Sequence, residues 1–93
     1  MKTTYIISYD LSSPGQSYEN VHKIIKEHFA WAKLGGSAYI ILTEETAVQI
    51  RDKISSVMDS NDQLFVGAVN APAAWVGMGD EVSNWLMNNL KNT

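Results

Sequence analysis

The chain alternates short runs of β-branched and aromatic residues with segments in which apolar residues recur every three or four positions. Residues 4–10 are a run of the first kind and predict a strand that ends at a polar cluster. Tyr5, Ile7 and Tyr9 fall on one face of this strand and Ile6 falls on the other. Apolar residues on both faces indicate a strand that is covered on both sides.

Three segments have helical periodicity. The first follows the loop signal Ser-Ser-Pro-Gly, with Ser17 at the N-cap position and an apolar stripe of Tyr18, Val21, Ile24, Ile25 and His28. Thr43 can cap the second, whose stripe is Ala47, Ile50, Ile54, Val57 and Met58, and the Asp-Ser-Asn-Asp run at 59–62 ends it in a turn. Asp80 can cap the third, which carries Val82, Trp85, Leu86 and Leu90.

Residues 29–42 allow two interpretations. One extends the first helix as far as Leu34, and the other places a hairpin here, with a turn at Gly35 and Gly36 and a strand over 37–42. A Gly-Gly pair between two apolar runs favours the hairpin, because both turn positions often need a positive φ. The alternating residues 63–70 predict a further strand.

The resulting order of strand, helix, two strands, helix and strand predicts an α+β fold, a ferredoxin-like βαββαβ sandwich over residues 1–70. Residues 71–93 would form a C-terminal extension and helix that packs on this domain or on a dimer partner. Both helices of the sandwich would cover one sheet face. We expect the core to include Ile7, Ile24, Ile25, Ile40, Ile50, Ile54, Val57 and Val66.

The other face of such a sheet has to meet solvent or a partner. We expect Tyr5, Tyr39 and Phe65 to lie there in part, and this surplus apolar surface predicts a homodimer. Trp75 and Trp85 in the C-terminal extension are suitable anchors for the interface.

The net charge is −3, with ten acidic residues against seven basic ones, and Arg51 is the single arginine. This balance argues against strong nonspecific binding of nucleic acid, although it is compatible with a local basic strip. The lack of cysteine excludes disulfides and thiolate metal sites. Asp10 interrupts the N-terminal apolar run, and no apolar stretch approaches the roughly 20 residues that a membrane span needs. We therefore expect a cytoplasmic protein with no membrane partner.

The aromatic and histidine side chains suggest little chemistry by themselves. His22 and His28 are six residues apart, so a helix does not bring them together as a metal pair. Trp31, Trp75 and Trp85 are interpreted as core or interface anchors. The alternative, base-stacking platforms, would need a surrounding basic groove.

Residues 5–10, Tyr-Ile-Ile-Ser-Tyr-Asp, resemble the first strand of the small dimeric nucleases of CRISPR adaptation, which ends in an aspartate. The strand at 37–42 follows in similar order, as do residues 59–66, in which an acidic turn leads into the last strand. The chain is most similar to the SinR-like branch of this superfamily, whose relatives include the virulence-associated protein D toxins. Asp10-Leu11, Pro14-Gly15-Gln16, Tyr18, the 59–62 turn and Ala74-Trp75 carry that similarity.

The resemblance implies a two-fold homodimer in which Asp10 and its symmetry mate hold a divalent cation, Mg²⁺ or Mn²⁺. Asp10 would then be the metal ligand and catalytic residue of an endonuclease that hydrolyses phosphodiesters of RNA or DNA. Where the family often has arginines, this chain has the Ser-Ser-Pro-Gly segment. The alternative is a non-catalytic homodimeric module of the same fold that binds a protein partner. Asp10 would then be a strand-end residue that bonds the following backbone.

Overall fold

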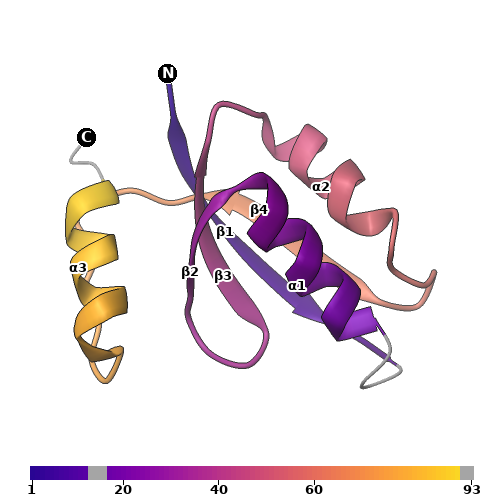
Figure 1. The fold of residues 1–93 in the computed structure, drawn as a ribbon. Coiled ribbons are helices and arrows are strands. Elements are labelled where there is room, and N and C mark those ends of the chain that lie inside the picture. The colour runs from indigo at the N-terminus through magenta and orange to yellow at the C-terminus, as the bar shows by residue number, and fades with distance from the viewer. Residues whose placement is uncertain (13–16, 91–93) are drawn as a thin grey trace.

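The structure is a computed structural model that describes residues 1–12 and 17–90, apart from the side chain of Ser17. Its elements are β1 (Thr3–Asp10), α1 (Ser17–His28), β2 (Ala30–Lys33), β3 (Ala38–Thr43), α2 (Ala47–Ser55), β4 (Gln63–Ala68) and α3 (Gly79–Asn89). The strands form one four-stranded antiparallel sheet in the order β2-β3-β1-β4. Helices α1 and α2 lie together on one face of it (Figure 1). This arrangement confirms the predicted ferredoxin-like fold. Ser17 begins α1, but its predicted capping lies outside the described side chains.

Strands β2 and β3 form the predicted hairpin, and the interpretation as a longer helix is wrong. Helix α1 ends at His28, and the strands then pair from Ala30 opposite Leu42 to Lys33 opposite Tyr39. In the connection, Gly35 has a φ of +138°, which residues with a side chain rarely adopt. Gly35 therefore allows the turn that joins β2 to β3, whereas α1 has already ended at His28, before β2 begins.

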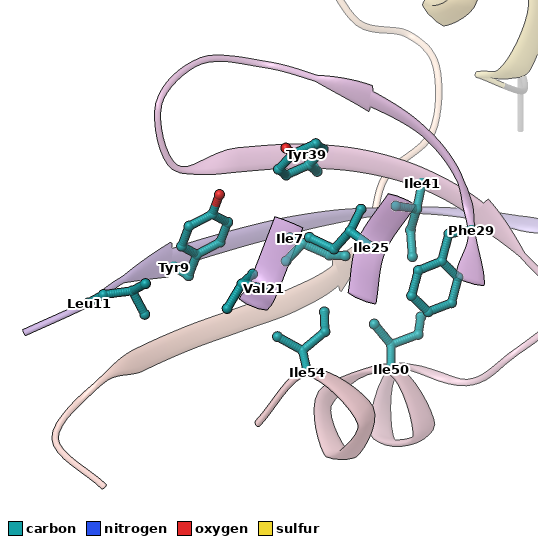
Figure 2. Packing of buried hydrophobic residues seen from close by; sticks show 10 residues of the cluster. All are labelled: Ile7, Tyr9, Leu11, Val21, Ile25, Phe29, Tyr39, Ile41, Ile50 and Ile54. Carbon is teal, nitrogen blue, oxygen red and sulfur yellow. The ribbon is translucent and has the colours of Figure 1, made fainter. Parts of the chain in front are cut away.

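The core fills the space between the sheet and the two helices. Figure 2 shows isoleucines from β1, α1, β3 and α2 meeting there. Burial of one such side chain contributes about 1.5–3 kcal/mol. Of the predicted core residues, five are buried (Ile7, Ile25, Ile40, Ile50 and Ile54) and three are partly buried and pack against the core (Ile24, Val57 and Val66).

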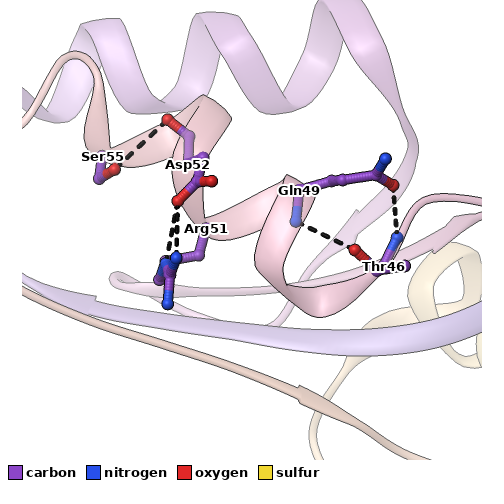
Figure 3. Close-up of polar contacts among 5 residues, drawn as sticks. All are labelled: Thr46, Gln49, Arg51, Asp52 and Ser55. Carbon is purple, nitrogen blue, oxygen red and sulfur yellow. Dashed lines mark hydrogen bonds and ion pairs between the residues drawn. The ribbon is translucent and has the colours of Figure 1, made fainter.

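The start of α2 lies three residues later than the sequence predicted. Thr46, not Thr43, is the N-cap, and its side chain accepts a hydrogen bond from the Gln49 backbone N–H at 3.2 Å. The Gln49 side chain in turn accepts one from the Thr46 N–H at 2.9 Å, which completes a capping box (Figure 3). Thr43 instead accepts a bond from the Glu45 N–H in the preceding turn.

Helix α3 lies away from α1 and α2, beside β2 (Figure 1). Its N-cap is Met78, not Asp80 as predicted, because the helix already begins at Gly79, and Met78 makes no side-chain capping bond. We call the sheet face opposite α1 and α2 the outer face. On it, Ala32 and Ile40 of β2 and β3 are buried although they lie outside the main core, and Leu86 of α3 is buried as well. Helix α3 therefore covers the β2 half of this face. None of the helices in the described part of the chain has the length and apolar content to span a bilayer.

Candidate functional site

Asp10 is the last residue of β1 and lies on the outer face of the sheet. Alternation along the strand places Tyr5, Ile7 and Tyr9 toward the helices, so Asp10 points the other way, as Ser8 does. Its backbone is opposite Gln63 of the edge strand β4. The Asp10 side chain is exposed, in a shallow depression lined by Ser8, Tyr9, Asp10, Gln63, Leu64 and Phe65.

A second carboxylate, Asp62, makes the hydrogen bonds that connect the backbone segments at this end of the sheet. It accepts hydrogen bonds from the backbone N–H and hydroxyl of Ser12, at 2.8 and 3.0 Å, and from the Asp59 N–H at 2.8 Å. These bonds from Ser12 and Asp59 hold the pKa of Asp62 below its ordinary value. Asp62 thus ties the residues after β1 to the predicted turn before β4. Within the described residues, the Asp10 side chain makes no hydrogen bond or ion pair.

One chain offers few ligands for a cation around Asp10. Among the residues that the structure describes, no group of three or more histidine, aspartate or glutamate side chains could hold a metal ion. The depression supplies one carboxylate together with the neutral oxygen donors of Ser8 and Gln63. Oxygen donors suit Mg²⁺, which usually keeps several waters and needs only one or two carboxylates. A second copy of the chain would provide the second carboxylate.

Arg51 is a residue of this region that the sequence interpretation missed. It extends from α2 and lines a second depression with Ala47, Val48, Leu64, Phe65 and Val66. The two depressions share Leu64 and Phe65, so Arg51 and Asp10 flank the same part of β4. Its guanidinium contacts Asp52 through Nε and Nη2, at 3.0 and 2.9 Å, and both side chains are largely exposed (Figure 3). An exposed pair of this kind is weak, so a phosphate can compete for the guanidinium.

Phe65 is the large apolar residue left open on the outer face. It is opposite Ser8 and its side chain is 62 % exposed. Its ring lies along Gly67, where an added Cβ would stand 2.7 Å from a ring carbon. The prediction that Tyr5 and Tyr39 share this face is wrong. Both point toward the helices, because alternation groups them with Ile7 and Ile41 in the core.

A cluster of polar aromatic residues lies on the helix side of the sheet. The Tyr9 hydroxyl and His22 Nε2 are 2.6 Å apart and share a hydrogen bond, and the rings of Tyr18 and Tyr39 pack against His22 at 6.2 and 5.4 Å. Burial, then the charges of Lys33 and Lys26, lowers the pKa of His22. Burial, then the nearby Tyr39 and Tyr18, raises the pKa of Tyr9. Both groups are therefore neutral near pH 7. The spacing of Tyr18 and His22, one helical turn apart, was the available sequence signal.

The three tryptophans differ in their surroundings. Trp75 donates a hydrogen bond from Nε1 to the Ser83 hydroxyl at 3.0 Å. It also lines a depression together with Leu86 of α3. Trp85 is also partly buried. Both are therefore packed within this chain, and their predicted contact with a dimer partner stays a prediction. Trp31 on the edge strand β2 is 37 % exposed.

Comparison with known proteins supports the fold. A crystal structure of a hypothetical protein, TT1823 from Thermus thermophilus, superposes with a TM-score of 0.71 over 86 % of this chain and 96 % of that chain, at 17 % sequence identity. No protein-family model and no curated protein matches the chain. At this identity, the similarity concerns the fold alone.

Proposed function

We propose that this chain is a metal-dependent endonuclease that hydrolyses phosphodiesters of RNA or DNA as a homodimer, with Asp10 of each copy binding one shared divalent cation. The observation that carries the proposal is the state of the Asp10 carboxylate. It is exposed and, among the described residues, unbonded, while Asp62 makes the bonds that close the adjoining loop. The structural role that would explain Asp10 without chemistry is thus filled by another residue. The resemblance of residues 5–10 to the first strand of the CRISPR-adaptation nucleases supports the same assignment.

The outer face supports the dimeric form of the site. Phe65 is exposed next to Asp10, on the half of the face that α3 leaves open. A two-fold contact through this half would cover Phe65 and bring the two Asp10 side chains toward each other. A divalent cation between them would offset the repulsion of the two carboxylates and polarise a bound phosphate. Arg51, in the adjoining depression, would hold a neighbouring phosphate oxygen.

The test compares Asp10→Asn with Asp59→Asn, which removes an exposed carboxylate from the nearby turn. Labelled single-stranded RNA and DNA are incubated with each protein and Mg²⁺ or Mn²⁺, and Mn²⁺ binding is measured by titration. We expect wild type and Asp59→Asn to cleave and to bind one ion per two chains. Asp10→Asn should lose both properties while keeping its circular dichroism spectrum. Equal cleavage by Asp10→Asn and wild type would refute the proposal.

A second candidate function, a non-catalytic homodimeric module that binds a protein, is favoured by the open outer face itself. The exposed Phe65 ring on that face could contact a protein partner without any cation or chemical reaction. If wild type cleaves neither RNA nor DNA with either metal, yet has the mass of two chains in solution, this second function becomes the better account.

A further inference from the structure

Three lysines gather on one side of the molecule, across α1 and β2. Lys23 and Lys26 are three residues apart on α1 and therefore share a helix face. They line a shallow depression together with Tyr18, Glu19 and His22. Lys33 of β2 is near the same place, because it lies two residues from Trp31, whose ring centroid is 5.0 Å from the Lys26 ammonium. The group holds three of the seven basic residues of an otherwise acidic chain.

Unlike the cations of α2, these three lysines make no ion pair within the described residues. Arg51 is paired with Asp52, and Lys53 with Glu45 at 2.9 Å. Over the described residues, none of Lys23, Lys26 and Lys33 makes an ion pair with a carboxylate, although Glu19 lines the same depression. All three are exposed. A set of unpaired cations on one surface is an electrostatic site for an anionic ligand.

Trp31 adds an aromatic surface to the lysines. It lies two residues before Lys33 on β2, so the two side chains share the face of the sheet that α1 covers. The Lys26 ammonium lies 5.0 Å from the centroid of the Trp31 ring. The Tyr39 ring packs edge-on against the Trp31 ring, with 5.8 Å between the two ring centroids. The ring is supported by Tyr39 and is still 37 % exposed. A flat, supported aromatic ring among cations matches a nucleotide, which presents a base beside its phosphate.

We propose that Lys23, Lys26, Lys33 and Trp31, which we call the α1/β2 strip, bind single-stranded nucleic acid. The lysines contact successive phosphates and a base stacks on Trp31, where it replaces the weak contact with the Lys26 ammonium. The bound nucleic acid is single-stranded, because a base in a duplex has both of its faces stacked on neighbouring bases and cannot stack on the Trp31 ring. An acidic polypeptide would satisfy the lysines but would leave the exposed Trp31 ring without a matching group.

The strip is separate from Asp10 but lies at the same end of the sheet. Lys33 is paired with Tyr39, which is paired with Ile7, and Asp10 is three residues further along β1. Three residues along a strand and two strands across correspond to roughly 14 Å between the Cα atoms of Lys33 and Asp10. Asp10 lies on the outer face and the strip on the face that α1 covers, so an oligonucleotide held on the strip would pass around this end of the sheet to reach Asp10. The inference rests on the proposed function in that it names the substrate class and the surface that holds it, yet binding requires neither the cation nor Asp10.

The experiment measures binding of a fluorescent single-stranded oligonucleotide by anisotropy, in EDTA, over a series of salt concentrations. For single strands, the slope of log K against log salt is about −0.7 per phosphate contact. The variant K23Q/K26Q/K33Q should bind weakly and show a slope smaller in magnitude by about 2. Lys53→Gln removes a paired lysine elsewhere and should leave the slope unchanged. An unchanged slope in the triple variant, or no binding by wild type at low salt, would overturn the proposal.

Changes at Trp31 test the stacking part. Trp31→Ala should weaken binding on the order of tenfold, and Trp31→Phe should retain most of the affinity, because any aromatic face can stack a base. Equal affinity for a duplex of the same sequence, or equally effective competition by polyglutamate, would overturn the assignment to single strands. Binding without cleavage would refute the nuclease and leave the strip intact, whereas cleavage that is unaffected by the triple variant would refute the strip alone.

Discussion

The Tyr9 hydroxyl and His22 Nε2 share a hydrogen bond of 2.6 Å that links the end of β1 to α1. His22 is neutral in this arrangement, since burial and the charges of Lys33 and Lys26 hold its pKa below the ordinary value of 6.5. Unfolding returns the imidazole to water and to its ordinary pKa. Proton uptake at His22 is therefore linked to unfolding.

The first prediction follows from that linkage. Once the pH falls to about 6.5, the unfolded chain binds a proton at His22 that the folded chain does not, so the free energy of unfolding should fall as the pH is lowered from there toward the pKa of folded His22. Urea titrations at a series of pH values measure it. His22→Gln should lack this decrease, and His28→Gln, at an exposed position, should keep it. The same decrease in both variants would show that another group is responsible.

The second prediction contrasts two buried tyrosines. The Tyr9 hydroxyl is bonded to His22, whereas the buried Tyr39 hydroxyl has no hydrogen-bond partner within the part of the chain described. Tyr9→Phe should lower the free energy of unfolding by about 1 kcal/mol, because it removes a bond and leaves His22 without its partner. Tyr39→Phe should raise it by about 1 kcal/mol, because it removes an unsatisfied polar group. Urea titration of both variants measures the free energy of unfolding. A lower value than wild type in both variants would contradict the assignment for Tyr39.

The third prediction separates the two carboxylates near the end of β1. Asp62→Asn should lower the urea midpoint at neutral pH, because the Ser12 and Asp59 N–H groups lose a charged acceptor. The pKa of Asp62 lies below its ordinary 3.8, so this contribution is present above that pH and is lost as the pH falls through the lower pKa of the folded state. Asp10→Asn should leave the midpoint unchanged. A large loss of stability in Asp10→Asn would indicate that Asp10 is structural after all.

The fourth prediction concerns assembly. If two copies meet through the open half of the outer face, Phe65→Asp places a charge in the contact and should yield the mass of one chain by light scattering, where wild type shows two. Val76→Asp is the matched control, since Val76 is 91 % exposed in the segment before α3. It should remain dimeric. Wild type with the mass of one chain at micromolar concentration would contradict the dimer.

The fold was largely predictable because its signals are local. The Gly35-Gly36 pair identified the hairpin, and the apolar stripes identified α1 and α2. Thr43 was wrongly predicted as the cap of α2, although Thr46 with Gln49 three residues later has the spacing of a capping box. The faces of Tyr5 and Tyr39 were misplaced because a period of two shows which residues share a side, but not which side the helices cover.

The candidate surfaces were less predictable because distant segments assemble them. Arg51 reaches β4 from α2, and Trp31 meets Lys26 from another element. Sequence spacing gives no sign of either pairing. Asp10 was identified only through its resemblance to a family, since an aspartate at a strand end is an ordinary turn residue. Asp62 accepts a hydrogen bond from Ser12, fifty positions away in the sequence, and only the folded structure shows this contact.

Helix α3 has a consequence for how many copies can associate. It occupies the β2 half of the outer face, so a chain presents only the β1 and β4 half to another copy. A two-fold contact pairs like with like and covers that half in both chains at once. In the proposed dimer, neither chain would then have an equivalent surface for a third copy, so growth would stop at two and would not continue into a filament. The eleven residues of α3 would thus make such an assembly self-limiting.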